Sequence, residues 1–414
     1  MNPSRSLRIV LATVGSRGDV QPMLALAQAL AGRGHVPVVA APPNFEGWVR
    51  GLGFEFAPLG VDMQLFLAQN PEMMTGNPVT LIKQTVHYFR DQMPVQAEQL
   101  IPACDGAHVI LSGGLAAAAP TVAQYLQIPI LGVLFTTCFL PSGQHPPPNI
   151  PWHGLPAWMN HLFWRLNRVL LDMLMRGTLN RIRAPLGLAL VDDVRRHLTQ
   201  DYPLVIAVDQ PLFPAEPRWN GRYDYTNFLF FDDPTPLDAE LAAWVSDGLP
   251  PVFVGFGSMS GRGTDRMGKI IVEAVGATGR RCIVGAGWSG LGTGALPSTW
   301  RVVKDVPHAL LFPRMAVVVH HGGSGTTAQA LRAGVPQVVL PLILDQFHHA
   351  HRLHLAGITP RPVAMEKITA AGLTGAIQAA MALPAGPRQE VAARLRASDG
   401  RVQIVQRVEA MAGA

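Results

Sequence analysis

Cysteine and charge are both sparse in this chain of 414 residues. Its three cysteines, Cys104, Cys138 and Cys282, are odd in number and lie far apart, so the sequence predicts no disulfide framework and is typical of a reducing compartment. Only 15% of the residues are charged, and the net charge of +5 comes without any block of five or more Lys or Arg. Dedicated nucleic-acid binding is therefore not indicated.

Long uninterrupted apolar runs are also missing. The apolar tract 109–140 contains Gly113, Gly114, Pro120 and Pro129, and this punctuation predicts a strand, a helix and a second strand rather than a membrane span. The first six residues lack the apolar core of a signal peptide. We therefore expect a cytoplasmic protein, with peripheral contact to a membrane surface left open.

The apolar residues that are present follow two different periods. They make up 48% of a chain that is too long for one ordinary core, so two domains are expected. Residues 7–14 and 36–40 are continuous apolar runs, whereas 20–31 carries its apolar residues at helical spacing. Continuous runs separated by helices are typical of buried parallel strands. We predict an α/β protein in which two Rossmann-like, doubly wound domains face each other across a cleft.

A passage rich in proline and aspartate, residues 211–236, marks the boundary between the two halves. We expect a first domain at 1–212, an interdomain linker at 213–238 and a second domain at 239–394. Residues 395–414 have the apolar spacing of an amphipathic helix, which is expected to pack back on the first domain.

The loop 320–327, with the sequence His-His-Gly-Gly-Ser-Gly-Thr-Thr, is the most specific feature of the chain. Its glycines allow the backbone to approach a ligand closely, and the helix that follows presents free amide groups. The loop therefore predicts a phosphate site, in which His321 adds a further donor. A tight strand-to-helix turn with two incidental histidines is the alternative. Neither a P-loop nor a dinucleotide-binding fingerprint is present.

A second candidate ligand contact is the pair Asp345-Gln346, which follows a buried strand. Open α/β sheets bind ligands beyond the carboxyl ends of their strands. A carboxylate beside a carboxamide can accept and donate hydrogen bonds, as the vicinal hydroxyls of a sugar require. The alternative is that Asp345 serves only as the N-cap of the next helix.

Several motifs of the chain, taken together, resemble one known family. They are Gly15 to Pro22, Thr226 to Pro234, Val254 to Met259, Gly287 to Gly290, Val306-Pro307-His308, His320 to Thr327, Arg332 to Pro336 and Asp345-Gln346. This set resembles the signature of family 1 glycosyltransferases, which have the GT-B fold. Within that family it is most similar to sterol glucosyltransferases and to bacterial natural-product glycosyltransferases.

The resemblance implies a role for each matching residue. Asp19 would be the catalytic base of an acceptor-binding first domain, with Ser16 orienting either Asp19 or the acceptor. The second domain would bind a nucleotide sugar, with Gln329 standing where plant members carry the Glu that holds the ribose. The donor contacts that the resemblance implies are Ser258, Val306, His321, Gly323, Gly325, Thr326, Thr327, Gln329, Asp345 and Gln346.

Members of this family invert the sugar in one displacement, which implies a base on one face of the sugar and stabilisation of the leaving group on the other. A general base contributes about 10² to 10⁴ in rate. A carboxylate with a pKa of about 3.9 is a weak base for an alcohol, so burial must raise the pKa of Asp19 or proton transfer must come late. The structural alternatives are that Asp19 caps a helix that begins at Val20 and that Ser16 forms a turn.

No metal and no cofactor are implied beyond the nucleotide sugar, for which UDP-glucose is expected. The chain has no Asp-x-Asp motif, and the adjacent aspartates at 192–193 and 232–233 are expected to be solvated. Four histidines that follow the donor motif at helical spacing lack a cysteine or carboxylate companion, so they do not indicate a metal site. They are His348, His349, His351 and His354.

The acceptor is indicated by residues 144–183, which are rich in Trp, Phe, Leu and Met and carry five arginines. This segment is too apolar for a solvated loop and too irregular for one core helix. An apolar acceptor pocket, a membrane-surface contact and packing on the first domain all stay open. Similarity to sterol enzymes favours a lipophilic alcohol such as a sterol. The alternative is a macrolide, polyketide or flavonoid acceptor with a UDP- or dTDP-sugar, and 29 arginines against four lysines fit a GC-rich bacterial genome.

Proteins of other classes are disfavoured. A sugar-nucleotide epimerase shares the two-domain plan but needs acid and base groups on both sides of the sugar and no acceptor pocket. A non-catalytic partner protein is expected to have lost the base or the phosphate motif, whereas this chain keeps Asp19, His321 and Asp345. A dehydrogenase would need the dinucleotide fingerprint that the chain lacks.

Overall fold

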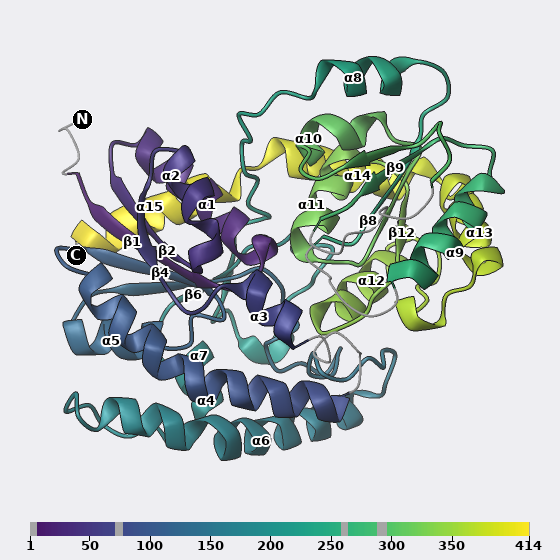
Figure 1. The fold of residues 1–414 in the computed structure, drawn as a ribbon. Coiled ribbons are helices and arrows are strands. Elements are labelled where there is room, and N and C mark those ends of the chain that lie inside the picture. The colour runs from purple at the N-terminus through teal and green to yellow at the C-terminus, as the bar shows by residue number, and fades with distance from the viewer. Residues whose placement is uncertain (1–5, 71–77, 258–263, 288–295, 414) are drawn as a thin grey trace.

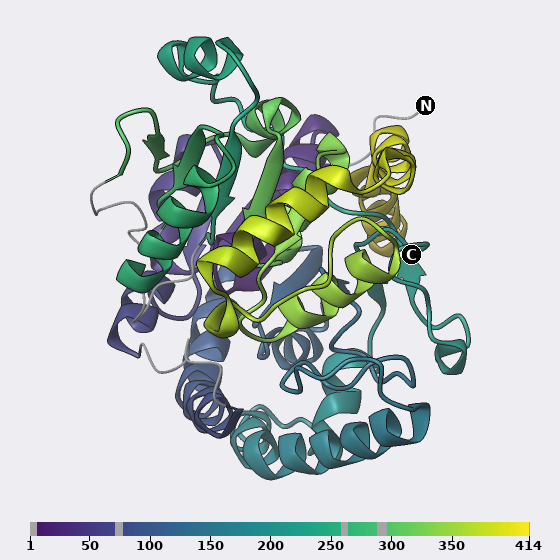
Figure 2. The ribbon, with the colours of Figure 1, turned by 90° about the vertical axis from the view of Figure 1, so that its right-hand side faces the viewer.

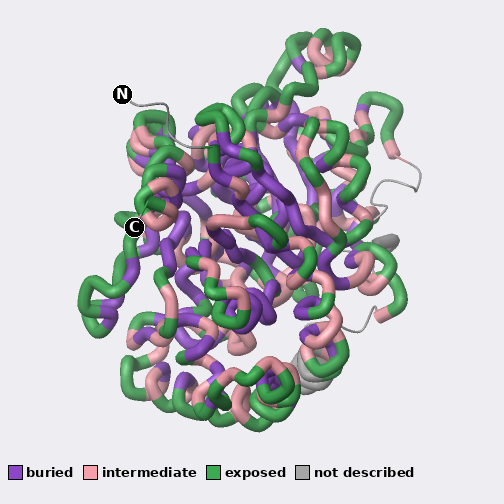
Figure 3. Tube along the Cα trace, turned by 90° about the vertical axis from the view of Figure 1, so that its left-hand side faces the viewer, coloured by how far each residue is buried: buried purple, intermediate pink, exposed green. Residues whose placement is uncertain are grey.

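The computed structural model describes residues 6–70, 78–257, 264–287 and 296–413. Two α/β domains stand next to each other, the first in purple to teal and the second in green (Figure 1). Each is built on its own parallel sheet, and the central strands of both are buried (Figure 3). This confirms the predicted α/β fold with two parallel-sheet domains.

The sheet of the first domain has seven strands in the order β3-β2-β1-β4-β5-β6-β7, and each described pairing is parallel. The sequence of β1, Arg-Ile-Val-Leu-Ala-Thr-Val, is apolar on both sides because helices cover both faces of the sheet. The strands are β1 (Arg8–Val14), β2 (Val36–Ala41), β3 (Glu55–Pro58), β4 (Val109–Gly114), β5 (Ile130–Leu134), β6 (Leu204–Ile206) and β7 (Asp224–Tyr225).

The helices of the first domain lie in layers on the two faces of this sheet. One face packs against α1 and the C-terminal helix, and the other packs against α4 and α5, with α6 outside them (Figure 1). The helices are α1 (Arg17–Gly32), α2 (Glu46–Gly51), α3 (Met63–Gln69), α4 (Pro78–Ala103), α5 (Ala119–Leu126), α6 (Ala157–Arg183) and α7 (Val194–Thr199).

The second sheet has five parallel strands in the order β10-β9-β8-β11-β12. These strands are β8 (Val252–Gly255), β9 (Cys282–Gly285), β10 (Arg301–Val303), β11 (Val317–His320) and β12 (Gln337–Val339). The helices of this half are α8 (Ala239–Ser246), α9 (Thr264–Gly276), α10 (His308–Leu311), α11 (Ser324–Ala333), α12 (Asp345–Leu355), α13 (Ala370–Ala382), α14 (Ala385–Ala397) and α15 (Gly400–Gly413).

The last helix, α15, returns from the second domain to the first (Figure 2). Its residues Ile404 and Val408 are buried in the same core as α1, and the Glu409 carboxylate accepts a hydrogen bond from Arg33 at 3.0 Å. A separate apolar cluster joins the domains directly, because Ile206 of the first sheet packs in it together with Leu353 of α12.

Several local features differ from the sequence-based expectations. The final twenty residues form the end of α14 and all of α15 rather than one helix. Residues 213–238, expected to be an interdomain linker, also include strand β7 of the first sheet and the buried side chains Phe228 and Phe230. The segment 144–183, expected to be too irregular for one core helix, contains one continuous helix of 27 residues, α6, of which only one side is buried.

Candidate active site

A cavity of about 900 Å³ opens between the two domains. The loops that follow β1, β4 and β5 line it from the first domain, and those that follow β8, β10, β11 and β12 line it from the second. Ligands of open α/β sheets bind beyond the carboxyl ends of the strands, so this is the position expected for a ligand. The sequence-predicted site residues among the lining are Ser16, Asp19, Val306, His321, Gly323, Gly325, Thr326, Gln329, Asp345 and Gln346.

Two predicted donor contacts are not among the lining residues. Thr327 is fully buried in the first turn of α11, and its amide donates a hydrogen bond to the Gly323 carbonyl. Ser258 lies outside the described residues.

Asp19 lies in the first turn of α1, which begins at Arg17 and not at Val20 as expected. Ser16 is the N-cap, and its amide and hydroxyl both donate hydrogen bonds to Asp19 Oδ2, at 2.8 and 3.3 Å. Together they form a capping box. Asp19 Oδ1 has no hydrogen-bond partner among the described residues, so the same carboxylate that completes the cap offers its second oxygen to a ligand.

Two glycines make room for this carboxylate. Gly15 has a φ of +145°, and a Cβ on it would lie 2.2 Å from Asp19 Oδ2. Gly114, at the end of β4, has a φ of +58°, and a Cβ there would lie 2.4 Å from the Val14 carbonyl oxygen and 3.2 Å from the Asp19 Cβ. Both positions require glycine, since a side chain would displace the carboxylate or strain the backbone.

The environment of Asp19 raises its pKa to about 7. Burial is the main cause because it disfavours the charged carboxylate, and the negative charge of Asp345 adds to it. The hydrogen bonds from Ser16 act in the opposite direction but are outweighed. A carboxylate with a pKa near 7 has the basicity that a general base at neutral pH needs.

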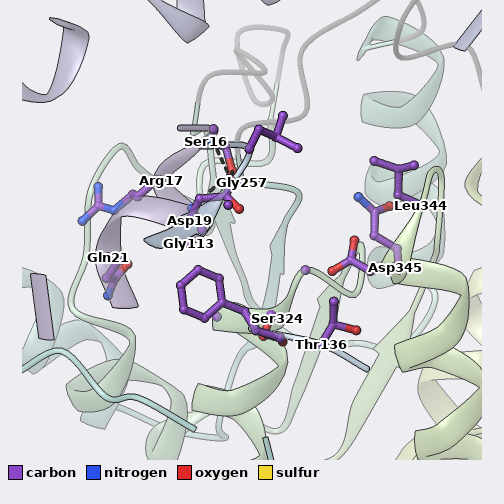
Figure 4. Close-up of a pocket in the computed structure, with 18 of the residues that line it drawn as sticks. Ser16, Arg17, Asp19, Gln21, Gly113, Thr136, Gly257, Ser324, Leu344 and Asp345 are labelled. Carbon is purple, nitrogen blue, oxygen red and sulfur yellow. Dashed lines mark hydrogen bonds between the residues drawn. The ribbon is translucent and has the colours of Figure 1, made fainter. Parts of the chain in front are cut away.

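Asp345 enters the cavity from the opposite side, at the start of α12 (Figure 4). The preceding residue, Leu344, has a φ of +49° and a ψ of −127°, and the Gln346 amide donates to the Ile343 carbonyl to close the turn. Such a backbone conformation favours glycine and costs about 1–3 kcal/mol in other residues. Burial raises the pKa of Asp345, and nearby His349 lowers it.

Gln346 supports this turn from within. Its side-chain oxygen accepts hydrogen bonds from the amides of Leu342 and Ile343, at 2.9 and 3.1 Å. Gln346 lines the cavity beside Asp345, but it is almost entirely buried. Gln346 therefore holds the loop that presents Asp345.

His321 follows β11 and lies close to two glycines, Gly257 after β8 and Gly323 in its own loop. A Cβ on Gly323 would lie 2.5 Å from His321 Nε2, and one on Gly257 would lie 3.2 Å from His321 Cε1. The Nδ1 atom is buried and has no hydrogen-bond partner in the described part of the chain. Burial lowers the pKa of His321 to about 4, so the ring is neutral at pH 7 before a ligand binds. The adjacent His320 is fully buried and hydrogen-bonded to the Gln337 side chain, so its ring is not available to a ligand in the cavity.

The first turn of α11 completes this side of the cavity. Gly323 is the N-cap without a side-chain acceptor, so the amides that begin the helix are directed at the cavity beside His321. A neutral imidazole and a helix N-terminus together form a site for an anion such as a phosphate.

The sequence reasoning missed a set of contacts that hold the two halves of the cavity together. Ser324 Oγ donates to the Phe135 carbonyl at 2.8 Å, and Thr136 Oγ1 lies 3.1 Å from His349 Nε2. Arg17 also forms an ion pair with Asp305 across the cleft. Phe135 and Thr136 directly follow β5. Because ligands of open α/β sheets bind beyond the carboxyl ends of the strands, the position of these two residues could have indicated that they lie at the site.

The part of the cavity that lies in the first domain is mostly apolar. Helices α3, α4 and α6 all contribute to its wall, and among the side chains of these helices that the structure describes, no Lys, Arg, Asp or Glu is a lining residue. The apolar side chains of this wall are Met63, Phe66, Leu67, Tyr88, Phe89, Trp164, Leu170, Leu171, Leu174 and Met175. This region fits an apolar ligand that lies next to Asp19.

Within the described ranges, no group of three or more His, Cys, Asp or Glu side chains is arranged to hold a metal ion. The same part of the chain contains no helix long and apolar enough to cross a membrane.

Comparison with protein families agrees with this architecture. Residues 9–131 match the model of the glycosyltransferase family 28 N-terminal domain. Residues 270–411 match the model described as erythromycin biosynthesis protein CIII-like, C-terminal domain.

Curated relatives include proteins of Amycolatopsis orientalis and Arabidopsis thaliana. Glycosyltransferase GtfC of Amycolatopsis orientalis is 34% identical over 356 residues, which cover 85% of each chain. Vancomycin aglycone glucosyltransferase of the same organism is 32% identical, also with 85% of each chain covered. Sterol 3-beta-glucosyltransferase UGT80B1 of Arabidopsis thaliana is 32% identical over 90% of this chain, which spans only 62% of the plant protein.

Solved structures share the whole two-domain arrangement. The glycotransferase of kitacinnamycin superposes with a TM-score of 0.75 at 21% identity and covers 99% of both chains. Glycosyltransferase VinC in complex with dTDP gives a TM-score of 0.72 at 21% identity and covers 98% of this chain and 100% of VinC.

Proposed function

Since the chain belongs to the family 1 glycosyltransferases, sugar-nucleotide-dependent enzymes of the GT-B fold, we propose that it is an inverting hexosyltransferase. Its donor is UDP-glucose, and its acceptor is a hydroxyl group of a lipophilic small molecule such as a sterol. Asp19 acts as the general base.

The observation that carries this proposal is the placement of Asp19. Its carboxylate, with the pKa raised to about 7, lies between the apolar wall of the first domain and the anion-binding features of the second. An acceptor that fills the apolar region would present its hydroxyl to Asp19, while the donor would place its diphosphate at His321 and the start of α11. Asp345 would then face the sugar hydroxyls.

The proposed reaction is a single displacement. The acceptor oxygen attacks the anomeric carbon, its proton passes to Asp19 Oδ1, and the bond from the anomeric carbon to the diphosphate oxygen breaks. Negative charge develops on the leaving nucleoside diphosphate, where His321 and the α11 amides stabilise it. Attack opposite the leaving group inverts the anomeric centre, and no covalent enzyme intermediate is formed.

This site needs no metal ion in the proposed reaction. Loss of one hydrogen-bond donor from such a position costs roughly 2.7–4 kcal/mol of transition-state stabilisation, so a preorganised set of neutral donors can stabilise the charge that builds on the leaving group.

Two observations support a lipophilic acceptor and glucose. The wall contributed by α3, α4 and α6 is mostly apolar. Two relatives that resemble this chain at 32% identity are called glucosyltransferases, one for sterols and one for the vancomycin aglycone. A natural-product aglycone with a dTDP-sugar is the second candidate, because the structural neighbour VinC was solved with dTDP.

A transfer assay tests this proposal. The purified chain is incubated with UDP-glucose, or separately with dTDP-glucose, and with pooled sterols, flavonoids and macrolides in the presence of EDTA. We expect a mass gain of one hexose on an acceptor, with a product anomer opposite to that of the donor by NMR. Conversion of the donor sugar without any acceptor would indicate an epimerase, and a retained anomer would exclude the single displacement.

A further inference from the structure

Helix α6 forms an outer layer of the first domain and presents one long side to solvent (Figures 1 and 2). Apolar side chains recur on this side at spacings of four, four, three and four residues, which align them along one face of a helix. Their exposed fractions are 66% for Trp158, 45% for Leu162, 57% for Leu166, 49% for Val169 and 75% for Met173.

No packing within the described part of the chain covers these five apolar side chains. A soluble protein rarely leaves a contiguous apolar stripe of large side chains in water, because burial of each one is favourable. Trp152, which precedes the helix, is also 60% exposed, and its ring lies tilted against that of Phe163 with the ring centres 6.4 Å apart. Tryptophan has an apolar ring with a polar N–H group and is typical of the boundary between water and lipid.

Positive charge accompanies the apolar stripe. Arg165, Arg168, Arg176 and Arg181 are exposed on α6. The only acidic side chain of this helix, Asp172, is partly buried, and its carboxylate accepts a hydrogen bond from the Val194 amide. Arg168 alone of these four has an ion-pair partner among the described residues, Asp193 at 3.4 Å. The exposed side of α6 is therefore apolar and cationic at the same time.

We propose that the exposed side of α6, together with Trp152, binds the surface of an anionic phospholipid bilayer with the helix axis in the plane of the membrane. An exposed apolar stripe flanked by arginines is the pattern by which a helix lies at such an interface. A second copy of the chain fits less well, since its α6 would bring a second row of arginines against the first.

The opposite side of the same helix lines the cavity. Leu170, Leu171 and Leu174 of α6 belong to its apolar wall. A bilayer at the outer side would therefore lie one helix away from the acceptor region and would concentrate lipophilic acceptors there. This consequence rests on the proposed function, whereas the binding of a bilayer does not.

Vesicle co-sedimentation tests the proposal with the purified full chain. We expect it to sediment with phosphatidylglycerol vesicles, to bind phosphatidylcholine vesicles at least about tenfold more weakly, and to be released by salt. The triple variant Trp158→Ser/Leu166→Ser/Met173→Ser should bind anionic vesicles at least about tenfold more weakly than the parent chain. The double variant Arg165→Gln/Arg176→Gln should also bind these vesicles more weakly, and its binding should depend less on salt.

The matched control is Leu249→Ser, because Leu249 is 67% exposed but lies in the second domain. It should bind vesicles as the parent chain does. Calorimetric UDP binding, measured in each variant, verifies that the variants are folded. Equal vesicle binding by the parent and the triple variant, absence of binding to anionic vesicles, or dimerisation through α6 would each overturn the proposal. Vesicle binding without sugar transfer would overturn the proposed function alone.

Discussion

The Ser16 amide donates a hydrogen bond to Asp19 Oδ2 at 2.8 Å, so the carboxylate that caps α1 is also the carboxylate that faces the cavity. The two interpretations of Asp19 that the sequence leaves open, a helix cap and a base, are therefore compatible. The capping contact fixes one oxygen and thereby orients the other. A base held in this way needs no further side chain to position it.

The first prediction concerns pH. Asp19 must be ionised to accept the proton, and its pKa is raised to about 7, so kcat/KM should fall about tenfold for each pH unit below 7. The measurement is the initial rate of transfer at limiting acceptor concentration from pH 5 to 9. A profile that stays flat down to pH 5 would show that a carboxyl group of raised pKa is not the base.

The second prediction concerns the space around His321. Gly323 has an ordinary φ of −61°, so Gly323→Ala adds no backbone strain, but its Cβ would lie 2.5 Å from His321 Nε2. The imidazole must move, and loss of this donor should lower kcat roughly 10²- to 10³-fold and weaken UDP binding. Steady-state kinetics and calorimetry measure the two effects.

The matched control for that variant is Gly268→Ala on α9. Gly268 also has no positive φ, and a Cβ there meets no atom within 4 Å. Its kinetics should equal those of the parent enzyme. If Gly323→Ala also left kcat and UDP affinity unchanged, His321 would not contact the diphosphate.

The third prediction concerns the acceptor wall. Leu174→Gln on α6 keeps a good helix former but places an amide in the apolar region. We expect KM for a lipophilic acceptor to rise about tenfold because the amide must be desolvated, whereas UDP affinity should stay the same. Leu249→Gln, at an exposed position in the second domain, is the control. A parallel loss of UDP affinity would contradict the separation of acceptor and donor regions.

Much of the fold could be predicted because parallel sheets leave a clear pattern. β1, β2 and β11 are continuous apolar runs. Glycine also directly follows β1 and ends β4 and β8, three of the strands whose loops line the cavity. The motifs also indicated the family and the enzyme class correctly, and both are confirmed by the curated relatives. Chemistry-bearing residues lie at strand ends in this architecture, so residues far apart in sequence could be assigned to one cavity.

The remaining features depend on tertiary contacts that no local pattern contains. Leu344 adopts a glycine-like backbone conformation without being glycine, because Gln346 holds the loop from inside. The sequence of α6 does not have the pattern of one core helix, since the exposed stripe adds a second apolar side to the buried one. The apolar spacing predicts a helix that begins at Val20, three residues after the true start of α1, because the spacing does not show that Ser16 is the N-cap.

The stability of the Asp19→Asn variant separates the two roles of this residue. The asparagine oxygen can still accept the Ser16 amide, so the cap is retained. Because the native pKa of Asp19 is raised, the parent protein loses stability relative to the variant as pH rises from about 4 through 7. Thermal unfolding at pH 5 and pH 8 should show the variant gaining relative to the parent at pH 8. If the variant were destabilised equally at both pH values, Asp19 would not be a buried carboxyl group with a raised pKa.

The most direct test of the central claim is hexose transfer by Asp19→Asn and the parent enzyme under identical conditions, with UDP binding measured on the same preparations. We expect turnover to fall about 10²- to 10⁴-fold while UDP affinity stays unchanged. Near-normal turnover by Asp19→Asn would show that Asp19 is not the base, and the proposed mechanism would then be wrong.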